Sequence, residues 1–151
     1  MLPELVFHTF TAGDSLPSEL SIEMLTEFIY KELGVYSDSP AAIRKALEHA
    51  LSSEPQQGGR LIIATTDAML CAALLILDTH MELFVPEHLI VYLSVAEKYR
   101  NMGIGKQMLD LAKESCKGSF ALHVEADNPA RKLYTREGFS SPYVEMRWWR
   151  D

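Results

Sequence analysis

The stretch LSVAEKYRNMGIGKQML, at residues 93–109, passes through three patterns in succession. It starts inside an apolar run at residues 89–95, which predicts a strand, and it continues through a glycine-containing turn. A helical pattern follows, in which the inward positions are Ile104, Met108, Leu111 and Ala112. The sequence therefore predicts a strand, a turn and a helix in direct contact, and it raises the question of what such a turn holds.

The turn itself reads RNMGIGK, at residues 100–106. The first amides of a helix have no partner within the helix, and together with the helix dipole they attract an anion. Gly103 and Gly105 have no Cβ atom, so the backbone can close on a phosphate, and Arg100 and Lys106 add positive charge. These residues predict a cradle for a pyrophosphate. A plain strand-to-helix bend is the alternative.

Two common nucleotide motifs do not fit this turn. A dinucleotide fingerprint requires a third glycine where the chain has Met108, and a P-loop requires a glycine where the chain has Arg100. A phosphate-containing ligand at this turn would therefore be bound by neither of these two motifs.

Composition narrows the function further. The chain has 151 residues, a formal net charge of −7 and two cysteines, which favours one domain over residues 1–151 and disfavours a disulfide framework or a zinc site. The negative charge argues against nucleic acid as a partner and mildly favours a cationic one, or it only maintains solubility. With no targeting or membrane-spanning segment visible, we expect a cytoplasmic protein.

The remaining pattern predicts a mixed α/β layer architecture. A strand at residues 5–10 precedes two helices, at residues 18–33 and from Pro40, and then a hairpin of residues 61–65 and 69–77. After the stretch quoted above come a strand at residues 119–125, a short helix from Asn128 to Gly138, and a last strand at residues 143–149.

Two motifs together resemble a known family. Arg100-x-x-Gly103-x-Gly105 follows LSV, and DNPARKLYTREGF lies downstream at residues 127–139. Both, with the order of elements, are similar to the GNAT superfamily of N-acetyltransferases, which take an acetyl group from acetyl-CoA. The resemblance implies a mixed, largely antiparallel sheet flanked by helices, with the fourth and fifth strands splayed apart.

The resemblance also implies where the acyl donor binds. Pantetheine would lie between the splayed strands and bond to exposed backbone near Leu93 and Val95, as an added strand would. The amides of Asn101, Met102, Gly103, Ile104, Gly105 and Lys106 would cradle the pyrophosphate. Asn101 and Met102 depart from the small and basic residues often found in the family, which affects side-chain contacts there and leaves the amides unaffected.

The downstream motif supplies a candidate acid. Tyr134 resembles the family tyrosine that protonates the sulfur of CoA, and a phenol is protonated at neutral pH; simple packing in the core is the alternative. The family asparagine has two counterparts here, because the spacing to Ala130 and Tyr134 starts from Asp127 while Asn128 lies one residue later. Asn128 could bond the cofactor or cap the helix before Pro129.

His123 is the first candidate for a general base, because the alternation that directs Leu122 and Val124 inward directs it to the opposite face. Glu125, Glu87 and His88 are rivals, and a structural or surface role for His123 is equally open. We expect the acceptor pocket beneath the first two helices, near Tyr30, Glu32, Tyr36 and Asp38, unless these form a solvated face.

The sequence thus predicts an acetyl-CoA-dependent N-acetyltransferase acting on a primary amine of a small molecule or peptide. A non-catalytic acyl-CoA-binding sensor or interaction module is the alternative. Trp148 and Trp149 could pack against a second subunit of a homodimer or within the protein's own core.

Overall fold

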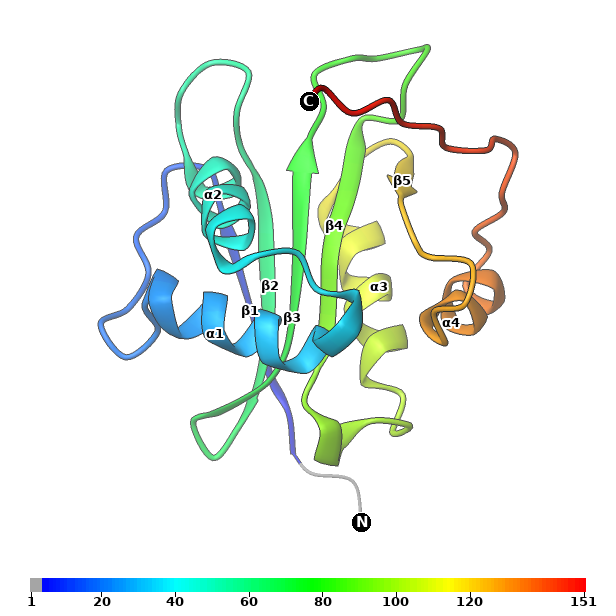
Figure 1. Cartoon of the computed structure of the whole chain (residues 1–151). Helices are drawn as coiled ribbons and strands as arrows, with labels where there is room; N and C mark the ends of the chain where they lie inside the picture. Colours follow the sequence, from blue (N-terminus) through cyan, green and yellow to red (C-terminus); the bar gives the residue numbers. More distant parts are fainter. Residues whose placement is uncertain (1–3) are drawn as a thin grey trace.

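A single five-stranded sheet, in the order β1-β2-β3-β4-β5, organises residues 4–151, the part of the chain that the computed structural model describes (Figure 1). Neighbouring strands are antiparallel except β4 and β5, which are parallel. In chain order the elements are β1 (Val6–Thr11), α1 (Ile22–Leu33), η1 (Gly34–Tyr36), α2 (Pro40–Leu51), β2 (Gly59–Thr66), β3 (Met69–Asp78), β4 (His88–Val95), η2 (Glu97–Tyr99), α3 (Ile104–Ser115), β5 (Phe120–Leu122) and α4 (Ala130–Arg136).

Local signals explain the ends of the first two helices. The Ser21 side chain accepts a hydrogen bond from the Met24 amide at the start of α1, and Gly34 ends this helix with a φ of 57°. Ser39 caps α2 in the same way, with Pro40 in its first turn. Both helices, and the predicted mixed architecture, are confirmed.

Helices cover both faces of the sheet, which creates two apolar layers (Figure 1). α1 and α2 pack on one face, against side chains that include Leu61, Leu75 and Tyr92. α3 and α4 pack on the other face, where Leu74 and Tyr134 belong to the same buried cluster. No helix in residues 4–151 is long and apolar enough to cross a membrane.

The structure differs from the sequence prediction in two details, in α3 and in β5. In α3 the residue buried beside Met108 is Leu109, whereas Leu111 is only partly buried. β5 is shorter than predicted, because it ends at Leu122. Val124 still packs toward the α3 cluster, as the alternation indicates, and His123 is exposed.

The predicted last strand at residues 143–149 is wrong. In the structure described for residues 4–151, this segment forms no helix and pairs with no strand, and its large apolar side chains are exposed. β5 offers only three paired residues, which is a short template for a further strand. The indoles instead stack with neighbouring guanidinium groups, Trp149 with Arg147 and Trp148 with Arg150.

The contrast between the buried sheet and the exposed C-terminal segment predicts a large loss of stability for one substitution and a negligible change for another. Leu74→Ala removes a side chain with 0 % exposure and should lower the free energy of unfolding by about 2–5 kcal/mol. Trp148→Ala changes a side chain that is 76 % exposed and should alter it by less than about 0.5 kcal/mol. Urea titrations followed by circular dichroism measure both. A large loss for Trp148→Ala would show that the segment is packed in solution.

Candidate active site

β4 and β5 diverge to form an open V. Their parallel pairing joins His88, Leu89 and Ile90 to residues 120–122, after which β5 ends while β4 continues to Val95. The second half of β4 therefore has no strand on its β5 side. This is the splayed arrangement that the sequence predicted, with the closed end at His88.

The exposed backbone groups of β4 can be assigned from its pairing with β3. The Ala96 amide donates to the Cys71 carbonyl at 2.8 Å, and Val95 lies opposite Ala72 in the register. Since consecutive residues of an antiparallel strand direct their backbone groups to opposite sides, Leu93 and Val95 direct theirs away from β3 and into the V. Both residues thus lie where an extended ligand could add to β4.

A nest of free amides lies below the V, between β4 and α3. Asn101 and Gly103 have left-handed φ angles of 62° and 81°. Within residues 4–151, the amides of residues 101–106 donate to no protein acceptor, and the first bonded amide is that of Gln107, which donates to the Gly103 carbonyl at 3.2 Å. Successive unpaired N–H groups at a helix start form an anion-binding concavity. The structure therefore places a run of free amides where the sequence predicted a cradle for a pyrophosphate.

The two glycines have different roles in this nest. An added Cβ at Gly103 would meet no atom within 4 Å, so it is the positive φ that favours glycine there. A Cβ at Gly105 would lie 2.8 Å from Leu133 Cδ2, so this glycine allows α4 to approach α3. The sequence interpretation assigned both glycines to phosphate approach.

The cationic side chains of the turn have protein partners. Lys106 Nζ lies 2.8 Å from Asp110 Oδ2, and this hydrogen bond raises the pKa of the ammonium group. Arg100 donates from Nε to the Val95 carbonyl at 3.0 Å and from Nη2 to the Glu32 carbonyl at 2.7 Å. Sequence reasoning missed the Glu32 partner of Arg100, because it lies 68 positions away along the chain.

Tyr134 lies in α4 and is 8 % exposed, with its ring 5.7 Å from the ring of Phe139. Burial, and then the charge of Glu125, raises the pKa of Tyr134 to about 12. Its hydroxyl makes no hydrogen bond within residues 4–151. Because no fully buried polar side-chain atom in this range lacks a hydrogen-bond partner, the hydroxyl oxygen of Tyr134 is accessible to solvent. The group is therefore a protonated donor at neutral pH.

Asn128 acts at the start of α4. Its Oδ1 accepts from the Ala130 amide at 2.9 Å, which is a capping contact. The preceding Asp127 carbonyl accepts from the Tyr36 hydroxyl at 3.2 Å. This bond ties the connection between α1 and α2 to the chain that leaves β5.

The four candidate bases occupy two regions. His123 and Glu125 are exposed and follow the end of β5, where His123 Nδ1 lies 3.4 Å from Arg147 Nη2. Glu87 and His88 lie at the closed end of the V, where Glu87 accepts from the Ser119 amide at 2.6 Å and His88 Nδ1 is 2.9 Å from Asp78 Oδ1. The structure thus gives Glu87 and His88 packing partners away from the open part of the V.

A polar pair on the α1 and α2 side was not predicted. The Tyr92 hydroxyl donates to Asp38 Oδ2 at 2.6 Å, and burial, then this bond, raises the pKa of the phenol. The signal in the sequence was a tyrosine within the otherwise apolar run LIVYL. Asp38 had been assigned to the acceptor pocket, and here its carboxylate is fixed beside β4. Tyr30, another of the residues expected in the acceptor pocket, is 49 % exposed.

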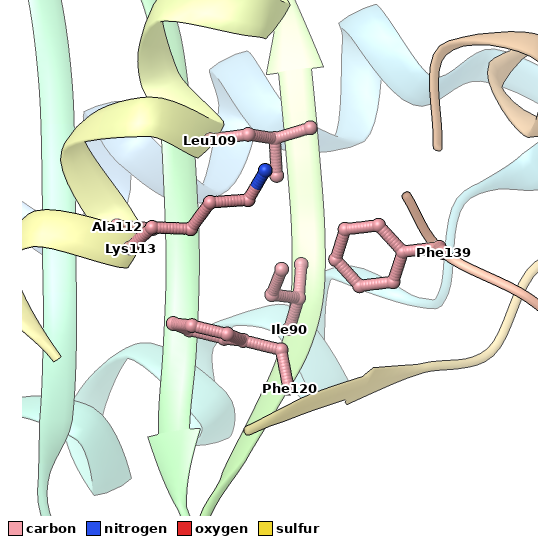
Figure 2. Close-up of a pocket in the computed structure, with 6 residues that line it drawn as sticks. All are labelled: Ile90, Leu109, Ala112, Lys113, Phe120 and Phe139. Atoms are coloured by element: carbon pink, nitrogen blue, oxygen red, sulfur yellow. The ribbon is translucent and has the colours of Figure 1, made fainter. Parts of the chain in front are cut away.

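Figure 2 shows a small apolar depression at the closed end of the V. Ile90 of β4, Phe120 of β5 and Phe139 surround it, with Leu109, Ala112 and the Lys113 stem on the α3 side. It leaves essentially no room even for a water molecule, whereas sites for cofactor-sized ligands have volumes of about 300–1,000 Å³. The depression therefore serves to pack β5 against α3, and the ligand groups are those of the open V and the nest.

Comparison with known proteins agrees with this geometry. Residues 57–141 match the family model described as an acetyltransferase (GNAT) domain. No curated protein matches the sequence significantly.

Solved structures share the fold at low identity. A possible acetyltransferase from Clostridium difficile 630 is 14% identical, with a TM-score of 0.67 and 97% of each chain covered. A predicted acetyltransferase from Clostridium acetobutylicum, solved with acetyl-CoA, is 15% identical, with a TM-score of 0.65 and coverage of 95% of this chain and 96% of that one. Aminoglycoside N-acetyltransferase AAC(6')-Iy, solved with CoA, is 13% identical, with a TM-score of 0.64 and coverage of 97% and 96%.

The match spans more than half of the chain and includes the β4 turn, the nest and α4. The open edge of β4 and the free amides of residues 101–106 both lie within the matched range. The chain belongs to the GNAT acetyltransferase family.

Proposed function

We propose that residues 1–151 form one N-acetyltransferase domain that transfers an acetyl group from acetyl-CoA to a primary amine of a small molecule or peptide. The observation that supports this proposal most directly is the run of free amides at residues 101–106 beside the open edge of β4. Free amides at a helix start suit a diphosphate, and an open strand edge suits an extended arm that contains amides.

The residues present fit acetyl-CoA, which supplies a thioester-linked acetyl group when it is bound. Leu93 would hold the pantetheine arm through its backbone groups that point into the V, and Val95 through its amide, since the Val95 carbonyl already accepts from Arg100 Nε. Ile104 would contribute its amide only, since its side chain is 2 % exposed and belongs to the core, and Met102 would contribute its amide from an exposed position. Asn128 would support the site by capping α4, the helix that carries Tyr134.

Two side chains would handle protons. Tyr134 would donate its hydroxyl proton to the departing sulfur, because its raised pKa keeps it protonated. His123 would accept a proton from the acceptor ammonium through Nε2, the ring nitrogen that does not face Arg147. Glu125, two residues further and close enough to shift the pKa of Tyr134, is the second candidate base.

The acceptor would approach from the side of α1 and α2, where the Asp38 carboxylate is held by Tyr92. A carboxylate there, together with the net charge of −7, favours a cationic amine over nucleic acid. A cytoplasmic location is consistent with the free thiols of Cys71 and Cys116. The exposed apolar side chains of residues 143–149 favour a homodimer.

A direct assay tests the proposal. The protein is mixed with acetyl-CoA and a panel of polyamines, aminoglycosides and peptides with free N-termini, and released thiol is measured. Transfer to one acceptor class supports the proposal. Acetyl-CoA binding in calorimetry without transfer to any of them would favour a sensor module, and absence of binding would refute both.

Tyr134→Phe should lower kcat by about 10²-fold or more, because the variant lacks the proton donor while the ring still packs against Phe139. Since the pKa of Tyr134 is raised to about 12, the phenol stays protonated and the wild-type rate should not lose this acid between pH 7 and 10. Steady-state rates across this range measure both effects. A variant rate within twofold of wild type would exclude the assignment.

His123→Ala should reduce the rate at pH 7 by about 10–100-fold and remove the fall in rate on acidification, because a base must be unprotonated to act. Glu125→Gln is the matched control on the same segment. If Glu125→Gln removes the acidic fall and His123→Ala does not, Glu125 is the base. If neither changes the profile, the acceptor needs no base from this segment.

Gly103→Ala should weaken acetyl-CoA binding about tenfold in calorimetry. Alanine at a φ of 81° is disfavoured by about 1–2 kcal/mol, so the loop would relax and the nest would have to re-form on binding. Gly105→Ala, where the new methyl meets only the mobile end of Leu133, should change the affinity less than threefold. Equal effects at both positions would contradict the separate roles assigned to them.

A further inference from the structure

The carboxyl end of α1 is bound to the loop that precedes the nest. Arg100 Nη2 donates to the Glu32 carbonyl at 2.7 Å and lies 3.2 Å from Glu32 Oε2, while Nε donates to the Val95 carbonyl. The same Glu32 Oε2 accepts from the Glu97 amide at 3.0 Å. One carboxylate therefore contacts both ends of the segment of residues 97–100, which includes η2.

The setting makes these contacts strong for a surface loop. The Glu32 side chain is only 9 % exposed, against 45 % for Arg100. A planar guanidinium that bonds a carboxylate and two carbonyls is held in one orientation, and hydrogen bonds to charged groups are shorter and stronger than neutral ones. The Glu32 carbonyl is also among the last of α1, which the helix itself cannot satisfy, so Arg100 caps α1 as well.

The anchored residue directly precedes the nest. Asn101 has a φ of 62°, which is unfavourable for a side-chain-bearing residue and requires support from its surroundings. Among the described residues, the amides of 101–106 have no protein acceptor to hold them, so the fixed points are Arg100 on one side and the body of α3 on the other. The conformation of the nest therefore depends on the hold that Glu32 has on Arg100.

We infer that Glu32 is a positioning residue for the diphosphate nest, acting through Arg100, and that neither side chain is primarily a ligand. This inference rests on the proposed function, since the nest is assigned to acetyl-CoA. It also removes Glu32 from the acceptor-binding groups that the sequence suggested. The end of α1 on the acceptor side and the nest would then behave as one unit.

Substitution with lysine separates positioning from simple attraction. Arg100→Lys keeps the positive charge but cannot bond Val95 and Glu32 together, whereas Arg100→Gln removes the charge as well. If Arg100 positions the nest, both variants should weaken acetyl-CoA binding by about tenfold. If Arg100 mainly attracts phosphate, Arg100→Lys should bind like wild type, which would overturn the inference.

Glu32 provides the second arm of the calorimetric test. Glu32→Gln should weaken acetyl-CoA binding about fivefold, and Glu32→Gln combined with Arg100→Gln should bind no more weakly than Arg100→Gln alone. Arg44→Gln, which removes an ion pair with Glu23 of α1 and another with Glu48 within α2, is the matched control and should leave affinity unchanged. Additive effects of Glu32 and Arg100, or an unaltered affinity for Glu32→Gln, would overturn the inference.

Hydrogen exchange of the ligand-free protein tests the anchor without acetyl-CoA. In Glu32→Gln the hydrogen-bonded amides of Glu97, Tyr99 and Arg100 should exchange at least fivefold faster, while those of β2 and β3 should not change. Faster exchange throughout the chain would indicate general destabilisation, and unchanged exchange of these three amides would show no anchoring; either result overturns the inference. If Glu32→Gln shows this exchange difference while wild-type protein binds no acetyl-CoA, the proposed function fails and the anchoring of the loop by Glu32 is still supported.

Discussion

The restricted pairing of β5 with β4 is the constraint on which the rest of the site depends. Only three residue pairs join the two strands, and several bonds fasten that short ladder at its closed end. The His88 amide donates to the Ser119 carbonyl at 3.1 Å, Glu87 accepts from the Ser119 amide, and His88 Nε2 lies 2.6 Å from the Lys117 carbonyl. Because the closed end is fixed, the strands can diverge beyond it while the sheet stays intact, and β4 keeps a free edge.

Backbone groups carry more of the predicted anion affinity than side chains do. Both cations of the turn are engaged within the protein, Lys106 with Asp110 and Arg100 with Glu32, so their charges are partly compensated. The amides of residues 101–106 and the start of α3 remain as the uncompensated positive ends. Because an amide is present whatever the side chain, the departure of Asn101 and Met102 from the pattern that the resemblance implies leaves this source of affinity in place.

Local signals in the sequence predicted much of the fold, and long-range contacts set the limits. Ser21, Ser39 and Gly34 mark helix ends through bonds within a few residues, and the RNMGIGK turn encodes its own conformation through Gly103. The partners of Arg100 and Tyr92 lie on α1 and the connection that follows it, which no local pattern reports. The segment of residues 143–149 has the alternation of a strand, but strand formation also needs a neighbour with free backbone groups, and β5 ends too early to provide one.

The two walls of the V are linked across the acceptor side by the connection between α1 and α2. Tyr36 in η1 bonds the Asp127 carbonyl beyond β5, Asp38 bonds Tyr92 on β4, and Glu32 at the end of α1 bonds Arg100 below the V. One short segment thus touches the chain beyond β5, the middle of β4 and the loop before the nest. Under the proposed function, a change of residues in this connection would alter the width of the V as well as the surface that meets the amine. Donor binding and acceptor binding would then depend on the same structural element, the connection that contains η1.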